Sequence, residues 1–180
     1  MRTKVLLTLA ILSLSASTTA SAYTVKPGDV LIRGVTGAGV NVARLYVATK
    51  ATPPAGMVMG VDVDWSFDGE WSLATSFRPT LSPGFVDANV GVGAKYRVLA
   101  LDAPFIPYAT GQLTTALGAP LGYGDVHWNL GARLAGGVDY FVMRDFAVGV
   151  EIGTELSALA VPLPAAEWTT EVLIGFSWRL

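Results

Sequence analysis

Apolar and polar residues alternate in two long segments between Val126 and Leu156. A period of two places successive side chains on opposite faces of a β-strand, so these segments predict a hairpin with one apolar face and one charged, glycine-rich face. The apolar face consists of Val126, Trp128, Leu130, Ala132, Leu134, Val138, Tyr140, Phe146, Val148, Val150, Ile152 and Leu156. Strands in soluble proteins average roughly five or six residues, whereas a strand that crosses a bilayer needs roughly 9 to 11. Both segments have membrane-spanning length.

The same alternation recurs along the rest of the chain. It predicts further strands over residues 29–36, 60–67, 70–78, 87–98, 105–117 and 167–180, and it allows the first to continue through 40–47. The pair Asp68-Gly69 is a strong hairpin signal, because glycine tolerates a positive φ. Together the segments make about eight antiparallel strands, an even number as in bacterial outer-membrane barrels.

The predicted connections alternate in length. Short turns near Asp68, Asp102 and Arg144 alternate with longer loops over 48–56, 79–86, 118–124 and 157–166. Short periplasmic turns and longer extracellular loops are the rule in outer-membrane barrels. The sequence therefore predicts an all-β fold, an eight-stranded antiparallel transmembrane β-barrel of outer-membrane type with both termini in the periplasm.

Composition favours the membrane over water. Of the residues, 52% are hydrophobic and only 14% charged, and the longest uncharged window, 103–124, is interrupted by prolines and glycines that would break a helix. In hydrocarbon only helices and closed barrels satisfy the backbone, so a barrel is the expected form. A soluble sandwich or lipocalin-like barrel fits the alternation equally well, but a soluble exterior normally carries more charges.

The N-terminus has the features of an export signal. Basic Arg2 and Lys4 precede an apolar run over residues 5–14, and Ala20-Ser21-Ala22 provides a small-residue cleavage site. We therefore expect a signal peptide over residues 1–22, one barrel domain over residues 23–180, and location in the outer membrane of a Gram-negative bacterium. The chain has no cysteine and hence no disulfide framework. Without a basic patch interleaved with aromatics, no nucleic-acid partner is expected.

Three segments resemble the OmpW family of small outer-membrane β-barrels. Residues 26–33 (KPGDVLIR) are similar to the family's opening strand, 105–111 (FIPYATG) to its fifth strand, and 137–146 (GVDYFVMRDF) to its hairpin of sixth and seventh strands. The chain departs from the family in ending with Leu180 instead of phenylalanine and in having shorter long loops. The resemblance implies passage of small hydrophobic compounds across the outer membrane, with outer-membrane lipid and the barrel-assembly machinery as partners.

The polar face of the predicted strands is expected to line a narrow lumen, just wide enough for side chains or one small ligand. The candidate lumen residues are Arg33, Asp62, Asp64, Arg78, Lys95, Arg97, His127, Arg133, Asp139, Glu151, Glu155 and Glu171, with Asp29, Glu70, Asp87 and Arg179 beside them. One interpretation is a salt-bridged plug. The other is a water-filled or ligand-sized space, left free by glycines on the same face: Gly91, Gly93, Gly131, Gly137, Gly149, Gly153 and Gly175.

The predicted long loops are rich in apolar residues. An exposed apolar patch usually marks an interaction site, so one hypothesis is a mouth from which a hydrophobic molecule leaves sideways between strands. The other is loops that fold onto each other or dip into lipid headgroups. The candidate mouth residues are Leu81, Phe85, Leu121, Leu159, Val161 and Leu163.

The functional prediction is a narrow channel, or a site where small hydrophobic molecules enter. A non-conducting structural or host-interaction barrel has the same fold and stays open as an alternative. A lipid-modifying enzyme is disfavoured, because the one histidine, His127, falls on the lumen side with no serine within two positions. One histidine and no cysteine give no metal-ligand spacing, and no cofactor is expected.

Overall fold

The alternating segments form eight strands that close on themselves. The computed structural model describes residues 25–44, 55–99, 104–122, 126–161 and 165–180, so the predicted signal peptide over residues 1–22 lies outside the described residues. The strands are β1 (Val30–Arg44), β2 (Ala55–Ser66), β3 (Trp71–Ser82), β4 (Phe85–Arg97), β5 (Phe105–Pro120), β6 (His127–Met143), β7 (Phe146–Val161) and β8 (Ala165–Arg179).

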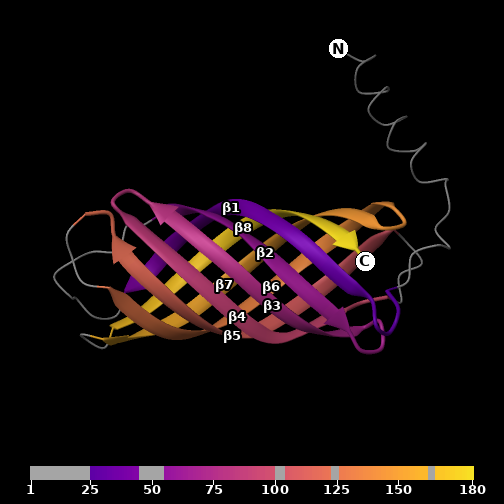
Figure 1. The fold of residues 1–180 in the computed structure, drawn as a ribbon, viewed down its shortest axis with the longest axis horizontal. Coiled ribbons are helices and arrows are strands. Elements are labelled where there is room, and N and C mark those ends of the chain that lie inside the picture. The colour runs from indigo at the N-terminus through magenta and orange to yellow at the C-terminus, as the bar shows by residue number, and fades with distance from the viewer. Residues whose placement is uncertain (1–24, 45–54, 100–103, 123–125, 162–164) are drawn as a thin grey trace, which may run out of the picture.

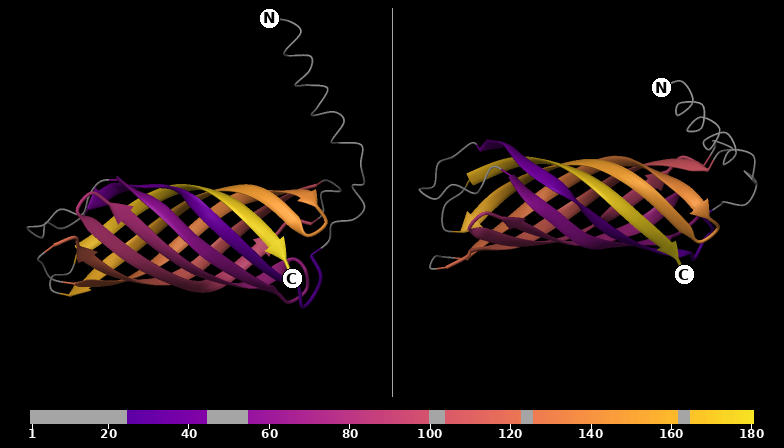
Figure 2. Two further views of the ribbon diagram at one scale, coloured as in Figure 1. Left: turned by 45° about the horizontal axis from the view of Figure 1, so that its top comes forward. Right: turned by 90° about the horizontal axis from the view of Figure 1, so that it is seen from above.

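Each strand pairs antiparallel with the next, and β8 pairs with β1 to close the barrel (Figures 1 and 2). The predicted closed eight-stranded antiparallel barrel is confirmed. In the described part of the chain, no helix is long and apolar enough to cross a membrane.

The two ends of the barrel are named by what lies there. Leu31 near the start of β1 pairs with Arg179 at the end of β8, and this end is called the terminal end. At the opposite end, called the loop end, β3 and β4 are joined by Pro83 and Gly84 alone. Gly84 has a φ of 78°, which glycine adopts without strain, so the turn closes in two residues.

The strands extend further toward the loop end than the sequence predicts. Residues 79–86 and 157–166 were expected to be loops, but β3 runs to Ser82 and β7 to Val161. The predicted difference in connection length is therefore wrong at these two hairpins. Pro79 is the first residue of the predicted loop, and proline is rare inside sheets because it lacks an N–H. In the structure it lies within β3, opposite Ala88 of β4, and the ladder to β4 continues beyond it.

Large apolar side chains point outward and charged side chains point inward. On β7, Val150 and Ile152 are exposed while Glu151 between them is buried. A soluble β-barrel has the opposite arrangement, with an apolar interior and a polar surface. The alternative of a soluble sandwich or lipocalin-like barrel is therefore wrong.

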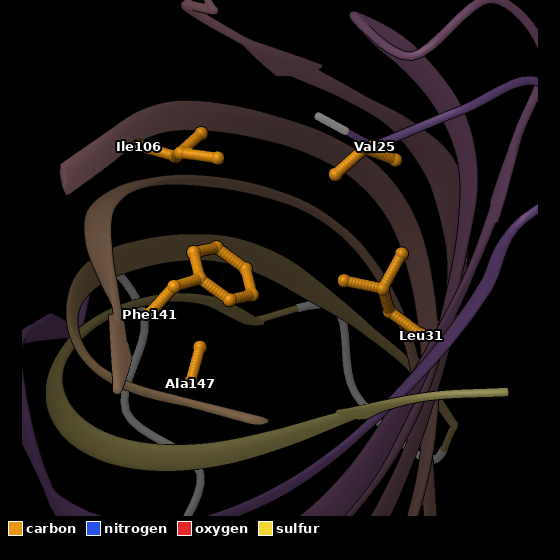
Figure 3. Packing of buried hydrophobic residues seen from close by; sticks show 5 residues of the cluster. All are labelled: Val25, Leu31, Ile106, Phe141 and Ala147. Atoms are coloured by element: carbon orange, nitrogen blue, oxygen red, sulfur yellow. The ribbon is translucent and has the colours of Figure 1, made fainter. Parts of the chain in front are cut away.

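The terminal end of the lumen is filled by an apolar cluster. Figure 3 shows its side chains converging inside the barrel: Val25, Leu31, Ile106, Phe141 and Ala147. Val25 precedes β1, and the segment that carries it is held against β2 by two backbone hydrogen bonds. Gly28 N donates to Ser66 O at 2.8 Å, and Ser66 N donates to Asp29 O at 2.9 Å.

Candidate functional site: the barrel lumen

The candidate lumen residues lie inside the barrel at different depths. Nine are buried: Arg33, Asp62, Asp64, Arg78, Lys95, Arg97, Arg133, Asp139 and Glu151. Three more, nearer the loop end, are partly exposed: His127, Glu155 and Glu171. Glu70 was expected beside them, but it is exposed in the turn between β2 and β3, so that expectation is wrong. Arg179 and Asp29 lie at the rim of the terminal end, 3.4 Å apart.

Glu151 on β7 is the centre of a buried ionic layer. Its Oε1 accepts hydrogen bonds from Arg78 Nη2 at 3.1 Å and from Arg133 Nη2. Its Oε2 accepts from the Tyr108 hydroxyl at 2.8 Å and from Arg33 Nη1 at 3.3 Å. Glu151 is 2% exposed and Arg33 1%. Burying an unpaired charge is costly, so this carboxylate depends on its surrounding donors.

Two further carboxylates complete the layer around Arg78. Asp62 accepts two parallel hydrogen bonds from Arg78, at 2.9 and 2.7 Å, a fork that fixes the plane of the guanidinium. Arg78 Nη1 donates to Glu171 Oε1 at 2.8 Å, and Arg133 Nε donates to the same oxygen at 2.5 Å. Glu171 on β8 thus links β3 and β6 across the lumen.

A second ionic group lies nearer the terminal end. Asp64 Oδ2 accepts hydrogen bonds from Lys95 Nζ at 2.8 Å and from Arg97 Nη2 at 2.7 Å. Lys95 Nζ also lies 3.9 Å from the centroid of the Tyr108 ring, a cation–π contact. Because the Tyr108 hydroxyl contacts Glu151, this side chain joins the two ionic groups.

The inner-wall glycines make room for these long side chains. A Cβ at Gly175 would collide with the Arg33 guanidinium, and a Cβ at Gly153 would lie 2.6 Å from Arg133 Nη2. Real Cβ atoms do not approach other atoms so closely. The hypothesis that the glycines leave a ligand-sized space is therefore wrong at this level, since arginine side chains occupy the space.

The ionic layer and the apolar cluster together fill the terminal half of the lumen. A water-wide passage would leave the side chains along it accessible to solvent. Arg33 and Arg97 are each 1% exposed and Lys95 is 4% exposed. Among the described residues, no water-wide passage therefore runs past these three side chains.

A polar cavity of about 110 Å³ lies on the loop-end side of the ionic layer. Arg78 and Arg133 belong to both, so the ionic layer forms the floor of the cavity. Glu155 lies on its wall and accepts hydrogen bonds from Asn89 Nδ2 at 3.0 and 3.1 Å and from Thr114 Oγ1 at 2.8 Å. Other acidic lining residues are Asp87, Glu167 and Glu171.

Two candidate mouth residues, Phe85 and Leu81, lie on different faces of the barrel wall at the loop end. Phe85 lines the cavity, with its ring centroid 6.0 Å from that of His127. Leu81 is exposed on the outward face of β3, so the prediction that it lines a mouth is wrong. The alternation of β3 continues to the end of the strand and carries Leu81 outward. In the described part of the chain, no group of three His, Cys, Asp or Glu side chains is placed to hold a metal ion.

The remaining mouth candidates do not form a described apolar surface. Leu121 is exposed in the turn that follows β5. Leu159 and Val161 belong to β7, and of these two only the strand position is described. Leu163 lies outside the described residues.

Two features of the site were not predicted from the sequence, the position of Tyr108 in the lumen and a gap in the ladder between β2 and β3. Tyr108 lies in the segment with the weakest alternation, although its position two residues after Ile106 places both on the inner face. The ladder between β2 and β3 skips Met59 and Gly60, between the pairs Val58–Thr80 and Val61–Phe77. Pro79 lies opposite this gap. Because proline has no backbone N–H, the sequence could have predicted a missing ladder hydrogen bond at this position.

Comparison with known proteins identifies the architecture. No protein-family model matches the chain, and a search of curated proteins finds no match. Among solved structures, Neisserial surface protein A (NspA) is 14% identical with a TM-score of 0.67, covering 85% of this chain and 97% of that chain. OprG from Pseudomonas aeruginosa is 13% identical with a TM-score of 0.60, covering 86% and 97%. The N-terminal β-barrel domain of Pseudomonas aeruginosa OprF is 14% identical with a TM-score of 0.58, covering 84% and 98%. At such identities the likeness shows the fold.

Proposed function

We propose that this chain is an integral β-barrel of a Gram-negative outer membrane, closed to passage along its axis, with a structural or interaction role. Its apolar outer wall supports the location, because hydrocarbon is the solvent that such a wall requires. Large side chains at least half exposed on this wall include Val92, Leu113, Leu117, Leu130, Leu134, Val150, Ile152, Leu156 and Val172. Outer-membrane lipid is then the partner of the wall, and the barrel-assembly machinery is the partner during insertion.

Aromatic pairs mark one border of this apolar wall. At the terminal end, ring centroids are 4.9 Å apart for Trp71 and Tyr96, and 4.8 Å apart for Phe105 and Tyr140. Aromatic girdles at the headgroup level are typical of outer-membrane barrels. The terminal end is then the periplasmic end.

Closure along the axis rests on one observation, the burial of the ionic layer around Glu151. This carboxylate is held by three arginines and a tyrosine from four other strands. A narrow barrel can be filled by its own side chains. No catalytic step belongs to the proposal, and the ring of His127 packs beside Phe85.

Planar-bilayer recording of the full chain tests this function. The purified protein, inserted into the bilayer, is expected to give no sustained single-channel current. Insertion is verified in matched vesicles by resistance to carbonate extraction and by the changed gel mobility of the unheated barrel. Stable current steps from an inserted barrel would contradict closure.

A second function has its own supporting observation, the gap in the β2–β3 ladder. Arg78 and Thr80 flank Pro79 on β3 and line the cavity. The gap between β2 and β3, called the seam, therefore borders the cavity. Fewer ladder hydrogen bonds make strand separation easier. In this second function a small hydrophobic molecule enters at Phe85 and leaves sideways into lipid between β2 and β3; passage of such molecules is what the OmpW resemblance implies.

Pro79→Ala tests this second function. Alanine restores a backbone N–H and is expected to lower the uptake of a hydrophobic dye into cells that carry the barrel. Pro107→Ala is the matched control, because Pro107 also lies within a strand but neither of its neighbours, Ile106 and Tyr108, lines the cavity. Equal uptake by both variants and the unchanged chain would contradict sideways exit at this seam.

A further inference from the structure

The outer wall carries an open groove of about 660 Å³ whose lining residues come from β3 to β8. Its lining is almost entirely apolar. The lining includes Trp71, Ala94, Tyr96, Ala109, Gly111, Leu134, Gly136 and Ile152, and its polar members are three threonines, Thr110, Thr154 and Thr170. The groove is open to the outside, so it can contact a ligand along one side only and does not enclose it.

Strand register builds the floor of the groove. Ala109 on β5 pairs with Gly136 on β6, and the neighbouring pair joins Ala94 on β4 to Gly111 on β5. Four small outward-facing residues thus meet on three adjacent strands. A Cβ at Gly136 would have its nearest contact, a backbone oxygen, at 3.7 Å, whereas a Cβ at Gly111 would lie 3.5 Å from Leu134 Cδ2, so the floor is open at Gly136 and bordered by Leu134 at Gly111.

Large aliphatic side chains form the sides of the groove. Leu134 pairs with Gly111, and Ile152 pairs with Gly136, so each stands directly beside a glycine. Leu134 is 66% exposed and Ile152 63% exposed, so both present large apolar surface to the outside. The groove therefore has a floor of small residues between two large, exposed aliphatic side chains.

An aromatic pair closes the end of the groove nearest the terminal end. Trp71 and Tyr96 line it, with their ring centroids 4.9 Å apart and their ring planes tilted by 47°. Tryptophan and tyrosine favour the membrane interface, where one part of the ring system meets hydrocarbon and another meets polar headgroups. The groove thus runs from the interfacial aromatics into the apolar wall.

We propose that this groove binds one acyl chain of a membrane lipid, with the lipid headgroup beside Trp71 and Tyr96. The inference rests on the membrane location proposed above. The groove is continuous with the lipid-facing wall, and an empty groove would forfeit dispersion contacts along its whole floor. A flexible alkyl chain can follow the floor between Leu134 and Ile152. A second barrel presents a convex wall and would rest on these raised side chains instead.

Gly136→Leu fills the groove and Gly34→Leu is the matched control. Both glycines lie on the outer wall, and a Cβ at Gly34 has no atom within 4 Å, but Gly34 does not line the groove. The full-length barrels are folded in phosphatidylcholine vesicles and transferred to mild detergent. Native mass spectrometry then counts the phosphatidylcholine molecules retained by each barrel.

The unchanged chain and Gly34→Leu are expected to retain one phosphatidylcholine, and Gly136→Leu to retain about tenfold less. Ala109→Leu blocks the same floor from β5 and is expected to act alike, which covers a failure of Gly136→Leu to fold. Equal retention by all variants, or equal loss in Gly34→Leu, would overturn the inference. So would a dimer that Gly136→Leu disrupts, since a second copy would then occupy the groove. Carbonate extraction of the unchanged barrel from vesicles would instead show that the membrane location is wrong.

Discussion

Glu151 and Glu155 are two inward carboxylates of β7, four residues apart, with different surroundings. Glu151 is 2% exposed and accepts hydrogen bonds from three arginines and a tyrosine. Glu155 is partly exposed, lines the loop-end cavity, and accepts hydrogen bonds from the neutral groups of Asn89 and Thr114. The same residue type on one strand therefore belongs to a closed layer at one level and to an open cavity at the next.

The contrast shows what fills the lumen at the level of Glu151. Width alone does not decide it, because the same eight strands surround both levels. The difference lies in the arginines at the level of Glu151, whose long side chains reach across the lumen to carboxylates on other strands. At the level of Glu155 the hydrogen-bond partners are short, and space remains between the walls.

The largest expected effect comes from Glu151→Gln. The substitution keeps the size of the side chain but leaves the positive charges of Arg33, Arg78 and Arg133 less compensated in a buried layer. Breaking a buried ion pair on one side costs about 3 to 5 kcal/mol. We expect a loss of that size in the free energy of unfolding, measured by urea titration of the barrel in vesicles.

Glu70→Gln is the matched control for this substitution, because Glu70 is exposed in the turn between β2 and β3. Its free energy of unfolding should stay within about 0.5 kcal/mol of the unchanged chain. A similar loss for both variants would mean that the ionic layer contributes no more than a surface carboxylate.

A glycine substitution tests the space that the arginines occupy. Gly175→Ala places a Cβ against the Arg33 guanidinium, which must move away from Glu151. Overpacking of this kind costs about 1 to 3 kcal/mol. Gly34→Ala on the outer wall meets no atom within 4 Å and should be neutral or slightly stabilising. Equal urea midpoints for the two variants would contradict close packing inside the lumen.

The alternation in the sequence predicts on which face of the barrel wall a side chain lies. It does not predict which side chains meet in the lumen, because that depends on strand register and on the closure of the barrel. Arg78 and Glu171 both stand at polar positions of period-two segments, and the structure places both in the lumen. Their contact could not be predicted, because they are 93 residues apart and meet only through the closure of the barrel. The role of Gly153 could not be predicted for a different reason: Arg133 lies on the neighbouring strand β6, and only the register of β6 and β7 and the direction of the Arg133 side chain place it over Gly153.

The ends of the strands were harder to predict than their faces. Pro79 was interpreted as part of a loop, although the outward position of Leu81 continues the period of β3. Proline marks a missing hydrogen bond and not necessarily the end of a strand. The gap in the ladder between β2 and β3 is therefore confined to the residues opposite Pro79, and β3 continues past it.

Glu155→Gln is expected to have a smaller effect than the two substitutions in the closed layer. Its partners Asn89 and Thr114 are neutral and both donate to Oε1, so an amide oxygen in that place can accept from both, and only the second contact of Asn89, to Oε2, is lost. The expected loss in the free energy of unfolding is about 0.5 to 1.5 kcal/mol, the value of one hydrogen bond. A loss as large as that of Glu151→Gln, in the same urea titration, would contradict the distinction between layer and cavity.

The smallest effect is expected for Asp145→Asn at the rim of the terminal end. Arg179 Nη2 lies 2.8 Å from Asp145 Oδ1, a distance similar to those in the buried layer, but the Asp145 side chain is 63% exposed. Water solvates both charges there, so the pair contributes at most about 0.5 kcal/mol, and less as salt is added. Urea titration at low and high salt measures both quantities. If Asp145→Asn lowered the free energy of unfolding as much as Glu151→Gln, the distance between the charges would decide the strength of these ion pairs. We expect a much smaller loss for Asp145→Asn, because burial among several partners is what makes the ion pairs of the ionic layer stabilising.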